Sequence, residues 1–168
     1  MSLKSMMARG TVLLAAAGKM MQTLQVRLTA GEVKDSVEHF EPYGFTSNPL
    51  SGAEVLTMFL SGDRSHAVVV VAADRRYRIK ELKPGEVAIY TDEGDKVHFK
   101  RGRIIDIETN TLNIKAATAV NFDTPVINQT GKIVSTGDQI AGGVSQIKHV
   151  HTNVQAGSGN SGPPAAGA

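Results

Sequence analysis

Residues 97–127 read VHFKRGRIIDIETNTLNIKAATAVNFDTPVI. Apolar residues occur here in pairs, and Gly, Asp, Asn or Thr separates one pair from the next. The first members of the pairs are eight, seven, eight and seven residues apart, at Val97, Ile105, Leu112, Val120 and Ile127. A regular interval between such short units indicates an array in which each unit stacks on the next.

The same pattern extends on both sides of this stretch. Val87 and Ile89 form an earlier pair, and after Pro125 apolar residues recur every seven residues, at Val126, Ile133, Ile140 and Ile147. A seven-residue interval also occurs in coiled coils. Here, however, Asn, Thr, Gly and β-branched residues are frequent, and the apolar residues within a unit alternate with period two. The sequence therefore favours short strands over a long helix.

Each predicted strand is too short to be stable alone. A strand of three to five residues buries one or two side chains, which does not offset the backbone entropy that it loses. Its apolar side could be covered in a single-chain β-solenoid, whose coils need about 18 residues or more, or by identical chains wound around one axis. Units of seven or eight residues suit one face of a triangular prism formed by three chains. We therefore predict a homotrimeric intertwined β-helix over residues 86–155.

Residues 19–85 have a different pattern, typical of a small β-barrel. Strand-like runs separated by turn signals occur at residues 24–28, 33–39, 55–60 and 67–73. The last run is continuously apolar, which predicts a strand buried on both faces. Short strands without an amphipathic helix indicate an OB-fold-like barrel, although SH3-like barrels give the same pattern. The predicted fold class is all-β.

Two terminal segments are predicted to lie outside these domains. In residues 1–18, Lys4 and Arg9 precede an apolar run at 11–17, as in the charged and apolar regions of a secretory signal. The run is short for that role, so a short helix or strand that packs on the barrel is the preferred interpretation. Residues 156–168 form a Gly/Pro/Ala-rich, low-complexity tail.

Composition limits the classes of function. The 168 residues are 41% hydrophobic and 20% charged, and the formal net charge of +2 is too small for a strong field toward a nucleic-acid backbone. With no Trp, five Phe and three Tyr, the chain has few aromatic platforms for sugars or bases. Without Cys, stability must come from burial or oligomerisation.

A histidine pair follows the repeat, in the sequence IKHVHTN at residues 147–153. In a strand, residues two apart point to the same side, so His149 and His151 share a face. One chain offers two imidazoles, whereas three chains around an axis offer six nitrogen ligands in an octahedral set. Zinc prefers four ligands, but Fe(II), Co(II) and Ni(II) accept six, and iron is the most available of these. We expect one iron ion per trimer to clamp the tip.

Other polar groups are interpreted as structural. Residues 75–80 (RRYRIK) could bind oligonucleotides, but an edge strand or a subunit contact is the preferred interpretation. Asp106 and Glu108 would share a strand face, as paired carboxylates of polysaccharide hydrolases do, but solvated outer-face charges explain them. The remaining histidines, His39, His66 and His98, have no neighbouring ligand motif. No nucleophile elbow or phosphate loop occurs, so we expect no enzymatic activity.

The barrel, the repeat and His149-Val-His151 together resemble the central spike, or baseplate assembly protein V, family of contractile-tailed bacteriophages, and most closely the Mu-type spikes. The resemblance covers about residues 19–155. It implies a barrel attached to the baseplate hub protein, a trimeric β-helix that points at the cell, and an iron ion held by six histidines. It also implies calcium or chloride ions on the axis, for which Asp138 and Asn128 are candidate ligands, although turn roles are preferred.

The resemblance implies that the chain punctures the outer membrane of the host when the tail sheath contracts. The protein would be assembled in the host cytoplasm and reside in the tail baseplate of the virion, without a nucleic-acid or small-molecule partner. Force transmission through a bilayer needs a narrow, stiff object whose apex does not unravel, and the predicted prism has these properties. The alternative function is an adaptor that binds carbohydrate or single-stranded nucleic acid.

Overall fold

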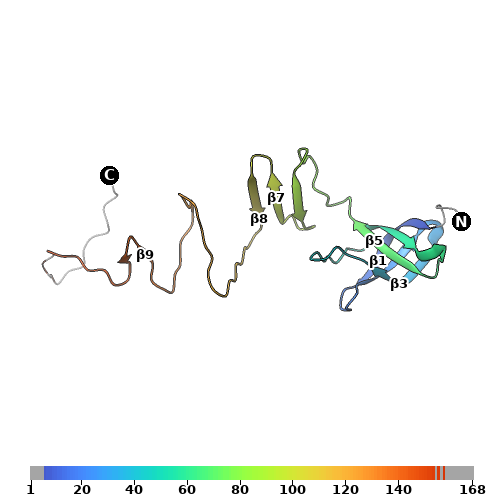
Figure 1. Cartoon of the computed structure of the whole chain (residues 1–168), viewed down its shortest axis with the longest axis horizontal. Helices are drawn as coiled ribbons and strands as arrows, with labels where there is room; N and C mark the ends of the chain where they lie inside the picture. The colour runs from blue at the N-terminus through green and yellow to red at the C-terminus, as the bar shows by residue number, and fades with distance from the viewer. Residues whose placement is uncertain (1–5, 154, 156, 158–168) are drawn as a thin grey trace. The chain divides into compact units, whose positions relative to one another are not determined.

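A computed structural model describes residues 6–153, 155 and 157 of the chain (Figure 1). These residues form strands β1 to β10, two short 3-10 turns and loops, so the prediction of an all-β protein is confirmed. The chain divides into two compact units, Met1–Ile114 and Lys115–Ala168. Among the described residues, no helix has the length and apolar character needed to cross a membrane.

The first unit begins with a closed five-stranded barrel. Its strands are adjacent in the order β1-β2-β3-β5-β4. Their bounds are β1 Met7–Ala16, β2 Thr23–Leu28, β3 Val33–His39, β4 Glu54–Phe59 and β5 Ala67–Ala73. β1 pairs with both β2 and β4 and so closes the barrel, while β3 and β5 run parallel. The closed five-stranded barrel is OB-fold-like, as predicted.

The interior of the barrel is almost entirely aliphatic. Every second residue of a strand points inward, so Val55, Thr57 and Phe59 of β4 are buried while their neighbours are partly exposed. The core cluster consists of Val12, Leu24, Val26, Leu28, Val37, Ala53, Val55, Phe59 and Val69. One chain therefore supplies a complete hydrophobic core for this part of the fold.

The barrel begins earlier than the sequence predicts. The predicted boundary places residues 1–18 outside the barrel, whereas β1 lies within this segment and pairs with two neighbouring strands. Val12 of β1 is buried in the core. The apolar run at 11–17 therefore contributes to the barrel itself, because closure requires a strand between β2 and β4.

The prediction that residues 67–73 are buried on both faces is wrong for the second half of the run. Val68 and Val69 are buried, but Val70 and Val71 are exposed. β3 pairs with β5 only at Val68 and Val69, so the rest of β5 has a neighbour on one side only. Val70 and Val71 instead line an apolar groove together with Phe45.

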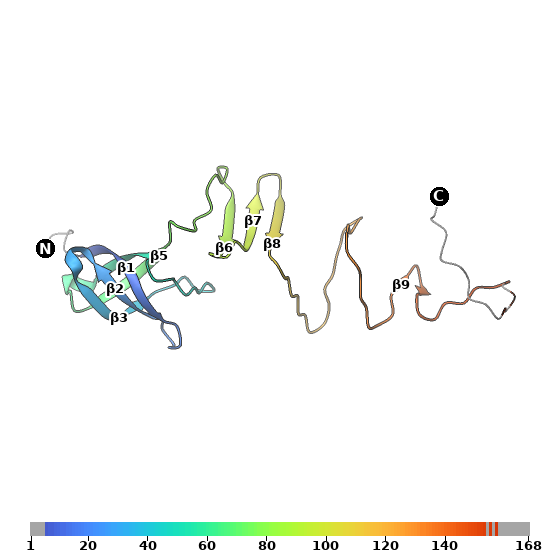
Figure 2. The same ribbon diagram turned by 180° about the vertical axis from the view of Figure 1, so that it is seen from behind.

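A three-stranded antiparallel sheet follows the barrel in the same unit. Figure 2 shows β6 (Val87–Tyr90), β7 (Lys96–Lys100) and β8 (Ile104–Glu108) side by side. The turns between them contain Gly94 and Gly102, whose φ angles of 99° and 85° are favourable for glycine. The first three apolar pairs of the predicted repeat lie on these strands.

The described part of the second unit contains a single hairpin. β9 (Ile140–Ala141) pairs with β10 (Val144–Ser145) through Gly142 and Gly143, whose φ angles of 57° and 83° suit a tight two-residue turn. Residues 109–139 contain no strand (Figure 1), although the sequence predicts several there. A short strand needs a neighbour to pair with, and none of the residues that the structure describes pairs with this segment.

A polar network attaches the loop after β3 to the barrel. His39 Nδ1 lies 2.9 Å from Gln22 Oε1, and Gln22 Nε2 donates to the Ser47 carbonyl at 2.7 Å. Because an amide oxygen only accepts, Nδ1 must carry the proton. Burial lowers the pKa of His39, and the nearby Glu41 carboxylate partly opposes this effect. The buried ring is therefore neutral at pH 7, a structural role that agrees with its interpretation from sequence.

We expect the free energy of unfolding to decrease as the pH falls below about 6.5. His39 of the unfolded chain takes up a proton near its ordinary pKa, whereas the lowered pKa of the folded state delays this uptake. The unfolded state then binds more protons, so acid favours it. Thermal unfolding between about pH 5 and pH 7.5 should show this dependence, and His39→Gln should remove most of it. The exposed His66 provides a control, since His66→Gln should preserve the dependence.

Candidate functional site

The sheet β6–β8 has one entirely apolar face. Directly opposed residues of an antiparallel sheet share a face. The apolar face is formed by two rows, Val87-Phe99-Ile105 and Ile89-Val97-Ile107. More than half of the Val87, Ile105 and Ile107 surface is exposed, at 59%, 58% and 54%. A contiguous exposed apolar patch of this kind is typical of an interaction surface.

The opposite face of the sheet carries charged side chains that pair across the strands. Lys96 Nζ lies 2.6 Å from Glu108 Oε2, and Lys100 Nζ lies 2.8 Å from Asp106 Oδ2. The hydrogen bond from Lys100 lowers the pKa of Asp106. Asp106 and Glu108 thus share a face, as predicted, and each is paired with a lysine of β7. This is an arrangement of outer-face ion pairs and does not resemble an acid/base pair around a substrate.

The apolar residues of the repeat remain uncovered beyond β8. Their exposed fractions lie between 47% for Val120 and 88% for Val134. The set consists of Leu112, Ile114, Val120, Phe122, Val126, Ile127, Ile133, Val134, Ile140 and Ile147. The core cluster contains barrel residues alone. The described residues of this chain therefore do not bury the repeat.

The two histidines of the tip lie next to each other. The ring centroids of His149 and His151 are 5.1 Å apart, and the ring planes are at 81° to each other. The prediction that both stand on one strand is not met in the single chain, because the structure has no strand at 147–153. Within the described part of the chain, no group of three or more His, Cys, Asp or Glu could hold a metal ion. Two imidazoles from one chain are an incomplete ligand set.

The contacts of His149 are suitable for a metal ligand. Its Nδ1 lies 2.9 Å from the Ser145 carbonyl oxygen. A carbonyl only accepts, so Nδ1 carries the proton and Nε2 keeps its lone pair. A ligating histidine commonly donates its other N–H to such an acceptor, which fixes the tautomer and the ring orientation. The residues present therefore fit an ion bound through imidazole nitrogen.

Comparisons with known proteins agree with this arrangement. Residues 9–76 match the family model described as Bacteriophage Mu Gp45, N-terminal, and residues 143–165 match the GpV Apex motif. The chain is 35% identical over 164 residues to the "Baseplate puncturing device gp45" of Escherichia phage Mu. The alignment covers 87% of this chain and 83% of that protein. The chain belongs to the phage Mu gp45 family.

A second relative of the gp45 family is the Mu-like prophage FluMu protein gp45 of Haemophilus influenzae. It is 36% identical over an alignment of 142 residues, and the match covers 77% of this chain and 77% of that protein. The N-terminal model of the family spans the barrel from within β1, and the apex motif contains the hairpin residue Gly143 and both histidines. The resemblance to the central-spike family is therefore confirmed.

Glu86 is a structural residue that the sequence does not predict. Its side chain is 6% exposed, and its carboxylate accepts the backbone N–H groups of Arg101 and Lys83, each at 3.1 Å. His98 Nε2 lies 3.2 Å from the same carboxylate. These contacts, foremost the hydrogen bond from Arg101, lower the pKa of Glu86. Glu86 thus anchors the start of the β6–β8 sheet, and no motif marks it because its partners are mostly backbone groups.

The two candidates for further ion ligands have different surroundings. Asp138 Oδ1 accepts the backbone N–H of Ile147 at 3.2 Å, and a hydrogen bond from Ser145 is the main cause of the lowered pKa of Asp138. Its carboxylate therefore stabilises the hairpin of its own chain. Asn128 is exposed in a segment without strands.

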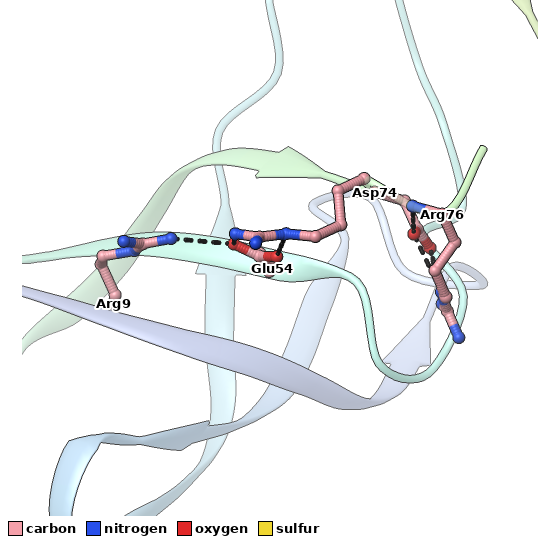
Figure 3. A network of polar contacts seen from close by, with 5 residues as sticks. Arg9, Glu54, Asp74 and Arg76 are labelled. Atoms are coloured by element: carbon pink, nitrogen blue, oxygen red, sulfur yellow. Dashed lines mark hydrogen bonds and ion pairs between the residues drawn. The ribbon is translucent and has the colours of Figure 1, made fainter. Parts of the chain in front are cut away.

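Two of the four basic residues in the cluster at 75–80 pair with acidic groups of the gp45-like barrel. Arg75 donates to Glu54 at 2.7 Å, and Arg9 donates to the same carboxylate at 2.9 Å. Figure 3 shows Glu54 beside Arg9, and Asp74 beside Arg76. Arg76 Nε donates to Asp74 Oδ1 at 2.9 Å, and this contact lowers the pKa of Asp74. The arrangement is an ion-pair network that connects β1, β4 and the end of β5.

We expect the chain not to shift single-stranded DNA in a gel at about 0.15 M salt, because Arg75 and Arg76 of the cluster are already paired with carboxylates. Glu54→Gln should release Arg9 and Arg75 and increase any retardation at low salt. Glu108→Gln, which frees a lysine of the β6–β8 sheet, serves as a charge-matched control. Binding by the unaltered chain that persists at high salt would contradict the structural interpretation.

Proposed function

We propose that this chain is the central spike of a contractile phage tail, and that it punctures the outer membrane of the host cell. One observation carries the proposal, namely an apolar repeat that its own chain leaves uncovered and that leads to an apex motif with a histidine pair. The relative from phage Mu is named a baseplate puncturing device, which supports the same role here. The chain would then reside in the tail baseplate of the virion.

The uncovered repeat supports a homotrimer. Complete burial of a Val, Ile or Phe side chain contributes about 1.5–3 kcal/mol to stability. Burial of the remaining surface of a half-exposed residue would therefore add roughly 1 kcal/mol. The same gain in free energy is available at each apolar pair from Val87 to Ile147. Three chains around one axis would place the apolar face of β6–β8 inside and the Lys96–Glu108 face outside. Units of seven to eight residues would then form an intertwined β-helix over residues 86–155.

We propose further that His149 and His151 of three chains hold one iron ion at the apex. The ion would supply six directional bonds that join three chain ends. Nε2 of His149 is available for this role, because Nδ1 already donates to Ser145. Calcium or chloride ions on the axis remain a proposal without assigned ligands.

Puncture is a mechanical function and needs no catalytic group. The barrel has a complete core of its own, which suits a domain held by a baseplate hub protein. Contraction of the sheath would drive the stalk, apex first, through the membrane. The polar groups of the β6–β8 sheet pair with each other, which supports a role without substrate chemistry.

A second candidate function is an adaptor that binds carbohydrate or single-stranded nucleic acid. The groove beside β5 favours it, since Phe40, Phe45 and Tyr77 line this groove and are partly exposed. Aromatic faces can stack on sugars or bases. An adaptor would bind a soluble polymer regardless of metal content, whereas the proposed spike would not.

We expect the chain to sediment as a trimer and Ile107→Asp to shift it toward the monomer. The substitution places a carboxylate on the apolar face, and burial of an unpaired charge is highly unfavourable. Glu108→Gln alters the neighbouring residue on the opposite face and should leave the trimer intact. Circular dichroism should show a folded barrel in both variants, since Ile107 lies outside the barrel core. A wild-type chain that sediments as a monomer would refute the proposed assembly.

We expect purified protein to contain iron at about one ion per three chains, as measured by elemental analysis. His149→Ala and His151→Ala should each abolish this content, whereas His66→Ala, at an exposed histidine of the barrel, should not alter it. A trimer that contains no metal would refute the clamp.

The same variants test the puncturing role. In a phage whose tail contains this chain, His149→Ala with His151→Ala should yield virions that adsorb but deliver DNA less efficiently. Equal infectivity of the double variant would show that the clamp is not needed for puncture.

A further inference from the structure

Ser145 connects the hairpin β9–β10 to the first histidine of the tip. Its carbonyl accepts the backbone N–H of His149 at 3.2 Å and lies 2.9 Å from His149 Nδ1. Its hydroxyl accepts the backbone N–H of Lys148 at 2.8 Å. One residue at the end of β10 therefore holds both the backbone and the ring of His149.

Asp138 holds Ser145 from the other side of the hairpin. Its Oδ1 accepts the backbone N–H of Ile147 at 3.2 Å, and the Ser145 side chain is a further hydrogen-bond partner of this carboxylate. Gln146 N donates to the Gln139 carbonyl at 2.9 Å and extends the hairpin by one more pair. These contacts form a continuous chain from Asp138 through Ser145 to His149.

We infer that Ser145 is a positioning residue for the metal ligand His149, and that Asp138 orients Ser145. The inference rests on the proposed metal clamp and adds to it the groups that aim the ligand. A neutral imidazole carries its proton on either nitrogen, and a hydrogen bond at Nδ1 selects the form in which Nε2 is free to bind. Partners of this kind typically contribute 10-fold to 100-fold in metal affinity.

The contribution of the hydroxyl can be separated from that of the backbone. Any residue at position 145 has a carbonyl, but a hydroxyl is needed to join Asp138 to the N–H of Lys148. Without the hydroxyl, the turn at 145–149 loses its hydrogen bonds to Asp138 and to the N–H of Lys148, and only backbone contacts then hold the Ser145 carbonyl near the ring. The ring of His149 packs edge-to-face on His151, so its orientation also affects the second ligand.

The test compares three serine variants of the full chain. Ser145→Ala should weaken iron or cobalt binding by about 10-fold to 100-fold in competition with a chelator, and Ser145→Thr should restore it. Ser135→Ala is the matched control, because the Ser135 hydroxyl donates to the Gly137 carbonyl in the same unit without contact to the histidines. Sedimentation of each variant checks that the trimer persists.

A second measurement does not depend on the metal. Nitrogen-15 NMR of the metal-free protein, labelled at histidine, should show His149 with its proton on Nδ1, and Ser145→Ala should shift this ring toward a mixture of tautomers. A proton on Nε2 in the unaltered protein, or wild-type affinity in Ser145→Ala, would overturn the inference while the clamp stands. A wild-type trimer that takes up no metal would overturn the clamp itself, and the inference with it.

Discussion

The structure depends on the requirement that each strand bury one apolar face. The barrel meets it within one chain, because β1 pairs with both β2 and β4 and the inward residues of all five strands share one core. The β6–β8 sheet and the repeat beyond it do not, since most of their apolar side chains are about half exposed or more. The same chain thus combines a self-sufficient domain with a segment whose apolar side chains the described residues leave largely uncovered.

The positions of the charged groups reflect the same requirement for one apolar face on each strand. Glu54, Glu86 and Asp106 each pair with nearby basic or backbone groups, in the barrel and on the outer face of the sheet. Exposed ion pairs contribute little to stability, typically about 0–1 kcal/mol. Their main effects are therefore to keep one face polar and to fix strand register, while apolar burial supplies the free energy. Carboxylates engaged in this way are not free for acid/base chemistry.

Much of the fold could be predicted from periodicity, because β3, β5 and the three pairs on β6–β8 have clear alternation or continuous apolar character. The exposure of Val70 and Val71 could not, since burial depends on which neighbour the topology supplies. Residues 109–139 form no strand in the structure, because a short strand needs a pairing partner and none of the described residues provides one. At the tip, the sequence indicates His149 and His151 but not Ser145, since a single hydroxyl that bonds to backbone groups leaves no pattern.

The end of a stacked array requires a different interaction from its middle. An interior layer has neighbours on both sides, whereas the last layer has one, and Ile147 and Val150 at the tip are 66% and 84% exposed. Three apolar side chains in a terminal layer would contribute a few kcal/mol at about 1.5–3 kcal/mol each when fully buried. A structural metal ion contributes on the order of 10 kcal/mol in a smaller volume. In the proposed trimer, an apex closed by imidazoles, with Ser145 and Asp138 to orient them, would therefore be both narrow and resistant to fraying where hydrophobic packing is weakest.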